Sequence, residues 1–584
     1  MEDNKTNSLV QTEALVIRQI TIRNFRGIAE LSLNLDETTV LIGGNNTGKS
    51  TILAAVQSCL NRSFNRRDGV FGEYDYHLKN KDGQPTEAAP IEIILTFSES
   101  REGTWPDEVD QLLDKAVGLE EDGRRCITIF VKSGYDETTK GYVTTATFLN
   151  PKGQPLPTKT LEALRGLQNL VPIFYLGALR DVAREFRPNS PFWGPFVRAM
   201  KIDPERRMKI ESELEALNKQ VLDAHTAFND VCDRLGKASK MVPLGGGPTP
   251  VSIEAIPGKI FDILAKTQVM LTGKTGANLP LDRHGEGTQS LAVICLFDAF
   301  LNLQQFIGEN KKTSNSIVAL EEPEAHLHPS AIRAVGNMLK EFKGQKIIST
   351  HSGDLLGSVP LSALRRLSRV DGTIRVHQID LSKFSDDDLR RLEHHIRRHR
   401  GHFLFANMWL LVEGETDELV FQEAARILGY DLFSKGVCCF EFTKVGVVRF
   451  IKLADHLGID WLVVADSDKA GKGYVDSVKD HLGKRKESEY IRQLPAENIE
   501  IFLCNEGLGS VYEANISPQK KDTITAQKGA LDYWAQVVGA LPSKGKPRIA
   551  AEAMDELERV GVTAMPYFLR ESIEMAVQRA KEAE

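Results

Sequence analysis

The chain has 584 residues, 41% of them hydrophobic and 26% charged, so it is long enough to form several globular domains with buried cores. Its 73 basic and 80 acidic residues give a net charge of -7, which excludes a protein that binds polyanions through overall positive charge and leaves only a local nucleic-acid surface. The polar start lacks the basic-then-apolar order of a signal peptide, and no apolar run reaches membrane-spanning length, so we expect a cytoplasmic protein without a membrane partner.

Short strands are predicted over residues 15–42, and the last of them is buried and runs into GGNNTGKST. This loop fits G-x-x-x-x-G-K-[ST] between a strand and a helix. In such a loop the backbone N–H groups cradle phosphates, the lysine reaches the terminal phosphates, and the next hydroxyl holds Mg²⁺. The residues expected to bind ATP here are Gly43, Asn45, Asn46, Gly48, Lys49, Ser50 and Thr51, with Ser50 also a metal ligand.

A helical insertion is predicted at about 198–240, where apolar residues recur at helical spacing on a charged background. The pattern fits a single surface helix, and it equally fits an insertion used for dimerisation. Further on, LDRHGEGTQSLAVICLF places Gly285, Gly287 and Ser290 at the start of an apolar helix. Backbone donors at such a start suit a phosphate.

An acidic partner for the phosphate loop is predicted in SIVALEEPEAHLHP, where a buried strand over 317–320 ends in two glutamates. We expect Glu321 to support Mg²⁺ and Glu322 to polarise the attacking water. The next apolar strand, in KIIST, ends beside His351, where a side chain can sense the γ-phosphate of ATP.

These motifs, in this order, resemble the ATPase heads of the ABC superfamily, especially the RecF and SMC branch. The resemblance implies that Gly287 and Ser290 complete the ATP site of a partner head, and therefore a dimer. Two positions depart from the usual pattern, because Glu321 and His328 stand where that superfamily usually has aspartates. GEGTQS is also a loose form of the LSGGQ element.

The stretch RRLEHHIRRHRGHF, residues 390–403, is rich in arginine and histidine. Such a run fits a solvated face, and it also fits a local contact with nucleic-acid phosphates. It marks a predicted boundary between a first domain, residues 1–400, and a second domain, residues 401–584.

Beyond this boundary strands and helices alternate, which predicts a parallel α/β sheet. Glu413 follows the strand MWLLV, Asp417 lies one helical turn further, and Asp466 and Asp468 follow the strand WLVVA. Because sites in parallel sheets form at the carboxyl ends of strands, we expect these acids to converge on Mg²⁺ or Mn²⁺. Glu415 and Glu418 fit an ordinary acidic helix start.

E-G-x-x-D with D-x-D downstream resembles the Toprim fold. Ala470 stands where topoisomerases usually have a third acid, which argues against strand passage. The pieces ENIEIFL and SKGKPRIA resemble the nuclease branch, and on that resemblance alone Glu500 is a metal ligand and Lys546 stabilises the charged transition state.

The combined order resembles the OLD (overcoming lysogenization defect) family of ATP-dependent endonucleases. This implies an α/β protein with an ABC/SMC-like ATPase domain, a helical dimerisation insertion and a carboxyl-terminal Toprim domain. It also implies ATP and Mg²⁺ (or Mn²⁺) as cofactors, DNA as substrate, a homodimer or higher homo-oligomer, a possible partner protein from a neighbouring gene, and a role in antiphage defence. The catalytic residues would be Glu322, His351, Lys546, Glu413 and Asp466, and the metal ligands Glu413, Asp417, Asp466, Asp468, Glu500 and Ser50. The main alternative is a RecF- or SMC-like repair ATPase that binds DNA without cutting it.

Overall fold

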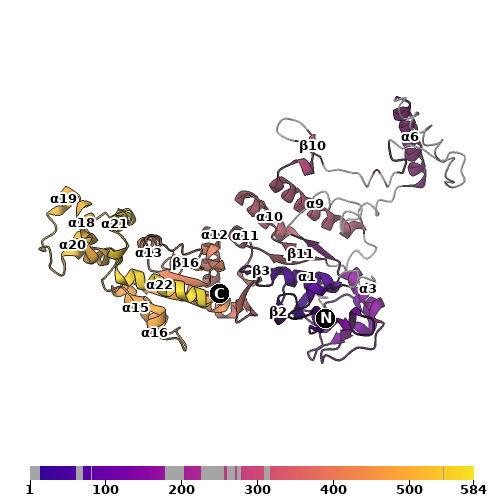
Figure 1. The fold of residues 1–584 in the computed structure, drawn as a ribbon, viewed down its shortest axis with the longest axis horizontal. Helices are drawn as coiled ribbons and strands as arrows, with labels where there is room; N and C mark the ends of the chain where they lie inside the picture. Colours follow the sequence, from indigo (N-terminus) through magenta and orange to yellow (C-terminus); the bar gives the residue numbers. More distant parts are fainter. Residues whose placement is uncertain are drawn as a thin grey trace, which may run out of the picture.

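The protein is elongated and contains three main β-sheets (Figure 1). The structure is a computed structural model, and it describes residues 14–60, 70–80, 82–177, 203–224, 256–259, 263, 270–272, 278–307, 316–542 and 545–583. No helix within these ranges is both long and apolar enough to cross a membrane.

The first sheet is antiparallel and has the strand order β2-β1-β4-β6-β5, with β7 paired to β6. Side chains of β4 alternate between buried and partly exposed over most of the strand, as expected for a sheet with one covered face. Helix α1 packs between this sheet and the second sheet, and its apolar residues share one core with both. The elements are β1 (Ile17–Phe25), β2 (Ile28–Asn34), β4 (Ile91–Ser98), β5 (Gly118–Leu119), β6 (Arg125–Asp136), β7 (Gly141–Leu149) and α1 (Lys49–Leu60).

The second sheet has the order β14-β13-β3-β12-β11-β8 and is parallel except for its edge strand β14. Strand β3 lies beside β12, and β12 beside β11, so the carboxyl ends of all three meet at one edge of the sheet. Helices α9 and α10 cover the face opposite α1. The elements are β3 (Thr38–Gly43), β8 (Ile173–Leu176), β11 (Ile317–Glu321), β12 (Gln345–Ser349), β13 (Leu364–Val370), β14 (Thr373–Gln378), α9 (Glu286–Ile307) and α10 (Pro329–Glu341).

The third sheet is parallel, with the order β16-β15-β17-β18. Strands β15 and β17 are almost wholly buried because both faces of the sheet are covered by helices. One face packs on α13, α21 and α22, and the other on α12, α14 and α15. The elements are β15 (Met408–Val412), β16 (Val437–Glu441), β17 (Asp460–Ala465), β18 (Ile491–Gln493), α12 (Asp386–Arg398), α13 (Glu415–Ile427), α14 (Val447–Leu457), α15 (Lys469–Lys479), α21 (Lys546–Val560) and α22 (Tyr567–Glu582).

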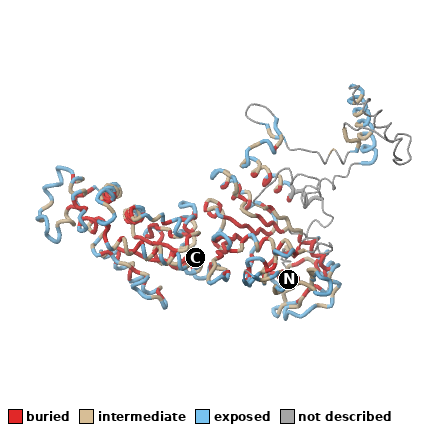
Figure 2. Tube along the Cα trace, in the orientation of Figure 1, coloured by how far each residue is buried: buried red, intermediate tan, exposed pale blue. Residues whose placement is uncertain are grey.

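One apolar core runs from the second sheet into the third. It joins α10 and β11 to β15 and β17 through α12 and α14, so the two halves of the chain share buried contacts. Figure 2 shows buried residues in both sheets and on either side of this junction. The sheets confirm the expected α/β class, with the sheet that leads into the phosphate loop in the first half and a parallel four-stranded sheet in the second.

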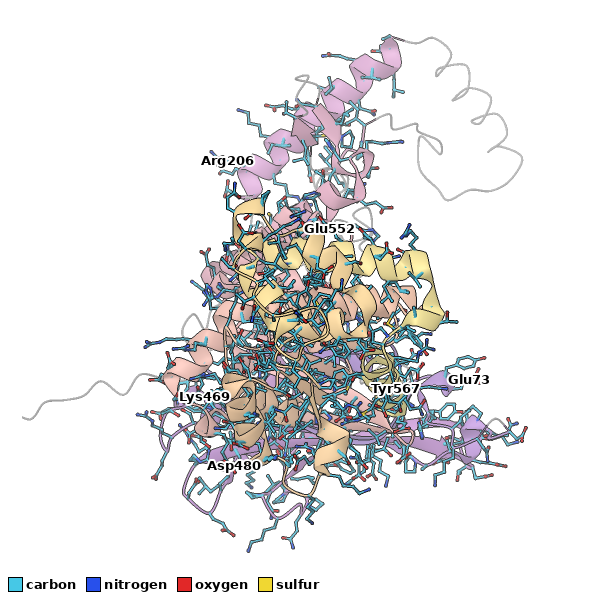
Figure 3. All side chains as sticks on the ribbon, turned by 90° about the vertical axis from the view of Figure 1, so that its left-hand side faces the viewer. Glu73, Arg206, Lys469, Asp480, Glu552 and Tyr567 are labelled. Atoms are coloured by element: carbon cyan, nitrogen blue, oxygen red, sulfur yellow. The ribbon has the colours of Figure 1, made fainter. Side chains whose placement is uncertain are left out.

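The predicted insertion at about 198–240 is described only in part. Helix α6 (Pro204–Asp223) begins with Asp203 as its cap and has no buried residue, and the rest of the insertion lies outside the described residues. In the view along the long axis, Arg206 of α6 lies above the body of the molecule, and Lys469, the first residue of α15, and Asp480, which follows α15, lie toward its lower part (Figure 3).

Candidate nucleotide and acidic sites

The loop after β3 has the backbone of a phosphate-binding turn. Gly43 has a φ of 146°, and a Cβ there would lie 2.2 Å from the carbonyl oxygen of Leu367, so only glycine fits. Gly48 also has a positive φ, of 91°. The amine of Lys49 donates to the carbonyls of Gly43 at 2.8 Å and Gly44 at 2.7 Å. Burial lowers the pKa of Lys49 to about 8, and the charge of Glu322 opposes that shift.

The acids predicted to serve this loop lie at the adjacent strand ends. Glu321 pairs in register with Ser349 of β12, and its carboxylate accepts a hydrogen bond from the Tyr175 hydroxyl. Glu322 has a left-handed φ of 43°, and its Oε1 lies 3.9 Å from Nε2 of His351. Burial and the positive charge of Lys49 lower the pKa of His351. The structure therefore brings Glu321, Glu322 and His351 to the edge of the sheet where the phosphate loop lies.

Ser50, Thr51, Asn45 and Asn46 belong to the phosphate loop and the first turn of α1. Ser50, Asn45 and Asn46 are exposed and Thr51 is half-buried. Asn46 has a positive φ of 60°, one of the sharp bends that curl the loop. The predicted ligands of this loop thus lie together, next to a helix start whose N–H groups suit phosphates.

Two residues of this site were not singled out from the sequence. Glu324 accepts hydrogen bonds from the Thr350 hydroxyl at 2.6 Å and the His351 backbone N–H at 2.9 Å, so it ties the loop after β11 to the end of β12. Burial raises its pKa, and its second oxygen is buried without a partner among the described residues. The other is Tyr175, whose pKa is raised by burial and by Glu321. Only their tertiary contacts reveal them.

Gly287 and Ser290 lie in the first turns of α9. A Cβ at Gly287 would lie 2.7 Å from the carbonyl oxygen of His326, so this backbone approach requires glycine. Ser290 is only 3% exposed. His328 caps α10 by accepting from the N–H of Ser330 at 3.3 Å. Among the described residues, no hydrogen bond or ion pair joins Gly287 or Ser290 to the phosphate loop of their own chain.

The second site forms at the carboxyl ends of β15 and β17. The Oε2 of Glu413 accepts a hydrogen bond of 3.0 Å from the N–H of Asp466. Asp468 caps α15 by accepting from the N–H of Gly471 at 2.7 Å. A Cβ at Gly471 would lie 2.1 Å from the Asp466 carbonyl oxygen, so glycine permits this tight turn. The acids after the two strands therefore face each other.

Two further carboxylates approach from helices. Asp417, in the first turn of α13, is 6% exposed, and Glu500, in α17 (Ile499–Leu503), is 4% exposed. Burial, then the charges of Glu500 and Glu413, raise the pKa of Asp417. Lys546, at the start of α21, lies with its Nζ 3.3 Å from Oε1 of Glu500. All six predicted residues of this site are thus brought together.

The electrostatics of the acidic site suit a cation. Burial raises the pKa of Asp466, and the four charges of Asp417, Glu413, Asp468 and Glu500 raise it further. One buried oxygen of Asp466 has no hydrogen-bond partner among the described residues. Carboxylates that repel one another, with an orphaned buried oxygen, fit a hard divalent ion as partner. Within the described ranges, no three acidic, histidine or cysteine side chains are already close enough to enclose an ion.

The other two acids of the first turn have different surroundings. Glu415 is exposed. Glu418 accepts from the backbone N–H of Glu441 at 3.1 Å and from Gln422 at 3.2 Å. Burial and Glu441 raise the pKa of Glu418, whereas none of the five clustered acids is among the causes. These two therefore lie outside the acidic site.

Two family models match the chain. The first is described as "Protein of unknown function (DUF2813)" and matches residues 15–230 and 265–402. The second is described as "Overcoming lysogenization defect protein-like, TOPRIM domain" and matches residues 404–468, which include Glu413, Asp417, Asp466 and Asp468.

Three relatives resemble the chain over most of its length. "Uncharacterized protein YbjD" of Escherichia coli is 27% identical and covers 95% of this chain and 97% of its own. "Old nuclease" of Escherichia phage P2 is 25% identical over 77% of each chain. "OLD nuclease" of Thermus scotoductus is 27% identical over 84% of this chain and 88% of its own. The chain therefore belongs to the family of the first model, and its residues 404–468 form an OLD-like Toprim domain that follows the phosphate-loop region.

Proposed function

We propose that this protein is an ATP-binding and ATP-hydrolysing endonuclease that cuts DNA phosphodiesters with the help of Mg²⁺ or Mn²⁺. The observation that supports it best is the convergence of five carboxylates with one lysine at the strand ends of the third sheet. The names of the relatives from phage P2 and Thermus scotoductus agree with a nuclease.

The acidic site would hold the divalent cation through its carboxylates. When bound, the ion would stabilise charge on the attacking and leaving oxygens. The chain's own residues would do the rest. The bond from the Asp466 N–H keeps Glu413 directed at the site, Glu500 positions the Lys546 amine, and that amine would neutralise charge on the scissile phosphate. The proposed ligands are Glu413, Asp417, Asp466, Asp468 and Glu500.

The phosphate loop would bind ATP with its backbone N–H groups. The Lys49 amine, now bonded to two loop carbonyls, would exchange them for phosphate oxygens. Ser50 and Glu321 would support Mg²⁺, Glu322 would polarise the attacking water, and His351 would sense the γ-phosphate. Gly287 and Ser290 would serve the site of a second head, which makes a dimer or larger homo-oligomer part of this proposal.

Residues 1–400 would form the ATPase domain, and residues 401–584 would form the nuclease domain. Exposed α6 would take part in dimerisation. We place the protein in the cytoplasm and in antiphage defence, with a possible partner encoded by a neighbouring gene.

Incubation of supercoiled plasmid with the full chain and Mg²⁺ or Mn²⁺ tests the nuclease. We expect nicked or linear product from the wild type and none from Asp466→Ala. Cutting that persists in Asp466→Ala, or no cutting by the wild type with either ion, would refute the nuclease. Lys49→Ala should abolish ATP turnover, and unchanged turnover would refute the assignment of the phosphate loop.

A second candidate is a repair ATPase of the RecF or SMC kind that binds DNA without cutting. It is favoured by the geometry beside the phosphate loop, where Glu321, Glu322 and His351 lie at adjacent strand ends and do not depend on the acidic site. ATP-dependent retention of plasmid in a gel-shift assay, without nicking by the wild type, would support this candidate over the nuclease.

A further inference from the structure

A cavity of about 900 Å³ lies beside the phosphate loop, between the two halves of the chain. One wall is the start of the loop, Gly43 to Asn45, together with His351. The opposite wall comes from the second half, from the turn between α13 and β16 and from the last turns of α22. Figure 1 shows the carboxyl end of α22 at the junction of the two halves, near β3. The volume is in the range of small-ligand sites.

The charged side chains that line this cavity are all basic. No aspartate or glutamate lines it, although the chain as a whole has a net charge of -7. Two lysines, Lys435 and Lys581, line it together with His351 and His402. Within the described ranges neither lysine is in an ion pair, in contrast to Lys479 and Lys528, which pair with glutamates. Two amines without a carboxylate partner, facing a phosphate loop, suit an anion.

The two lysines are attached to the elements that hold the acidic site. Lys435 lies in the turn that follows α13, whose first turn carries Asp417. Lys581 lies in the last turn of α22, which packs against α13 and β15. A ligand that attracts both amines toward the phosphate loop therefore pulls on the same elements that position the carboxylates.

We propose that Lys435 and Lys581 bind the terminal phosphate of a nucleoside triphosphate held by the phosphate loop, so that the second half of the chain completes the nucleotide site. This inference rests on the proposed function, namely that the loop binds ATP. Under the proposed function His351 and the first residues of the loop handle the γ-phosphate, and these same residues line the cavity. A nucleoside diphosphate lacks the group that the lysines bind. The cavity thus distinguishes tri- from diphosphate and links that distinction to the nuclease half.

Calorimetric titration of the full chain with ADP and with the non-hydrolysable β,γ-imido analogue of ATP tests the proposal. Each exposed charge pair contributes up to about fivefold in affinity, so Lys435→Gln with Lys581→Gln should weaken the analogue about tenfold or more. ADP affinity should change less than about threefold by the same reasoning. Lys520→Gln, exposed in α19 (Pro518–Lys521) at the far end of the molecule, is the matched control. Arginine at both positions should retain most of the affinity.

The wild-type chain gives an independent reading that does not depend on how the variants fold. Acetylation of lysines, followed by mass spectrometry, should show Lys435 and Lys581 protected by the imido analogue and not by ADP. Protection of Lys49 alone, or an equal loss of ADP and analogue affinity in the double variant, would overturn this inference while leaving the phosphate loop intact. A wild type that binds neither nucleotide would instead refute the proposed function and this inference with it.

Discussion

The carboxylate of Glu413 accepts a hydrogen bond of 3.0 Å from the backbone N–H of Asp466, and this contact joins the ends of β15 and β17. It keeps two acids from different strands face to face in a partly buried site. Burial raises the pKa of Glu413, and burial together with four neighbouring charges raises that of Asp466. The contact thus holds the acidic site together at a cost in stability that a bound cation would offset.

Asp466→Asn should separate catalysis from stability. The amide keeps the shape of the side chain and removes a buried, crowded charge, so we expect the metal-free protein to gain about 1 to 3 kcal/mol in free energy of unfolding. Plasmid cutting should fall at least about a hundredfold, since one ligand of the proposed cation is weakened. Urea unfolding in EDTA and the nicking assay measure the two effects. Asp480→Asn, an exposed acid after α15, is the control. A lower unfolding free energy for Asp466→Asn than for the wild type would contradict the claim that charge repulsion at Asp466 destabilises the metal-free protein.

The pH dependence of stability follows from the same acids. Glu413, Asp417 and Asp466 have raised pKa values in the folded chain, so above about pH 4 the folded state holds more protons than the unfolded state. Their contribution to stability therefore decreases as the pH rises from that value toward their folded pKa values. We expect the Tm in EDTA to fall more steeply with pH for the wild type than for Asp417→Asn with Asp466→Asn. The gain in Tm from Mn²⁺ should increase with pH, because protons compete with the ion. If Tm in EDTA changed with pH equally in the wild type and the double variant, the raised pKa values of Asp417 and Asp466 would not govern this dependence.

Lys546 is expected to act through Glu500 as well as on the substrate. Lys546→Ala leaves the buried Glu500 carboxylate without its cation, and because Lys546 is one-third exposed we expect a loss of about 1 to 3 kcal/mol in unfolding free energy. Adding Glu500→Gln should restore stability without restoring DNA cutting, whereas Lys546→Arg should retain both. A full double-mutant cycle by urea unfolding gives the coupling. No coupling would mean that the 3.3 Å contact contributes nothing.

Local patterns predicted the parts of each site that lie within one motif. Sequence spacing alone shows which residues share a strand end or a helix turn. It therefore predicted the phosphate loop, the strand that ends at Glu321, and the alternating strands and helices from residue 408 onward. Glu324 and Tyr175 could not, since their roles arise from contacts across the sheet. Glu500 and Lys546 were identified only by resemblance, because each lies on a helix whose packing the sequence does not reveal. The cavity beside Lys435 likewise depends on how the halves pack.

Glu324 is expected to be a positioning residue for ATP hydrolysis. Its one bonded oxygen orients Thr350 and the backbone of His351, next to the residues proposed to handle the γ-phosphate. Glu324→Gln keeps an acceptor and removes a buried carboxylate, so the Tm should stay or rise while the kcat for ATP falls about tenfold or more with little change in KM. Glu341→Gln, exposed at the end of α10, is the control. A change in KM alone would assign Glu324 to nucleotide binding instead.

Arg366 of β13 joins the two halves of the chain. Its guanidinium donates to the carbonyls of Leu457 and Gly458, each at 3.1 Å, and at 3.0 Å to the Ala406 carbonyl and the Asn407 side chain. The residue is 3% exposed, and burial lowers its pKa to about 10.

Arg366→Ala would leave four acceptors of the second half without a donor. We expect a loss of about 3 to 5 kcal/mol in unfolding free energy. Arg366→Lys should recover only part of that loss, because an ammonium group cannot reproduce the planar set of donors of a guanidinium. Arg375→Ala, exposed on the neighbouring strand β14, should change stability by less than about 0.5 kcal/mol. Because Arg366 bridges the sheets, its removal should also split urea unfolding into two transitions, seen by fluorescence and circular dichroism. A single transition with wild-type midpoint would mean that the shared apolar core alone holds the halves together.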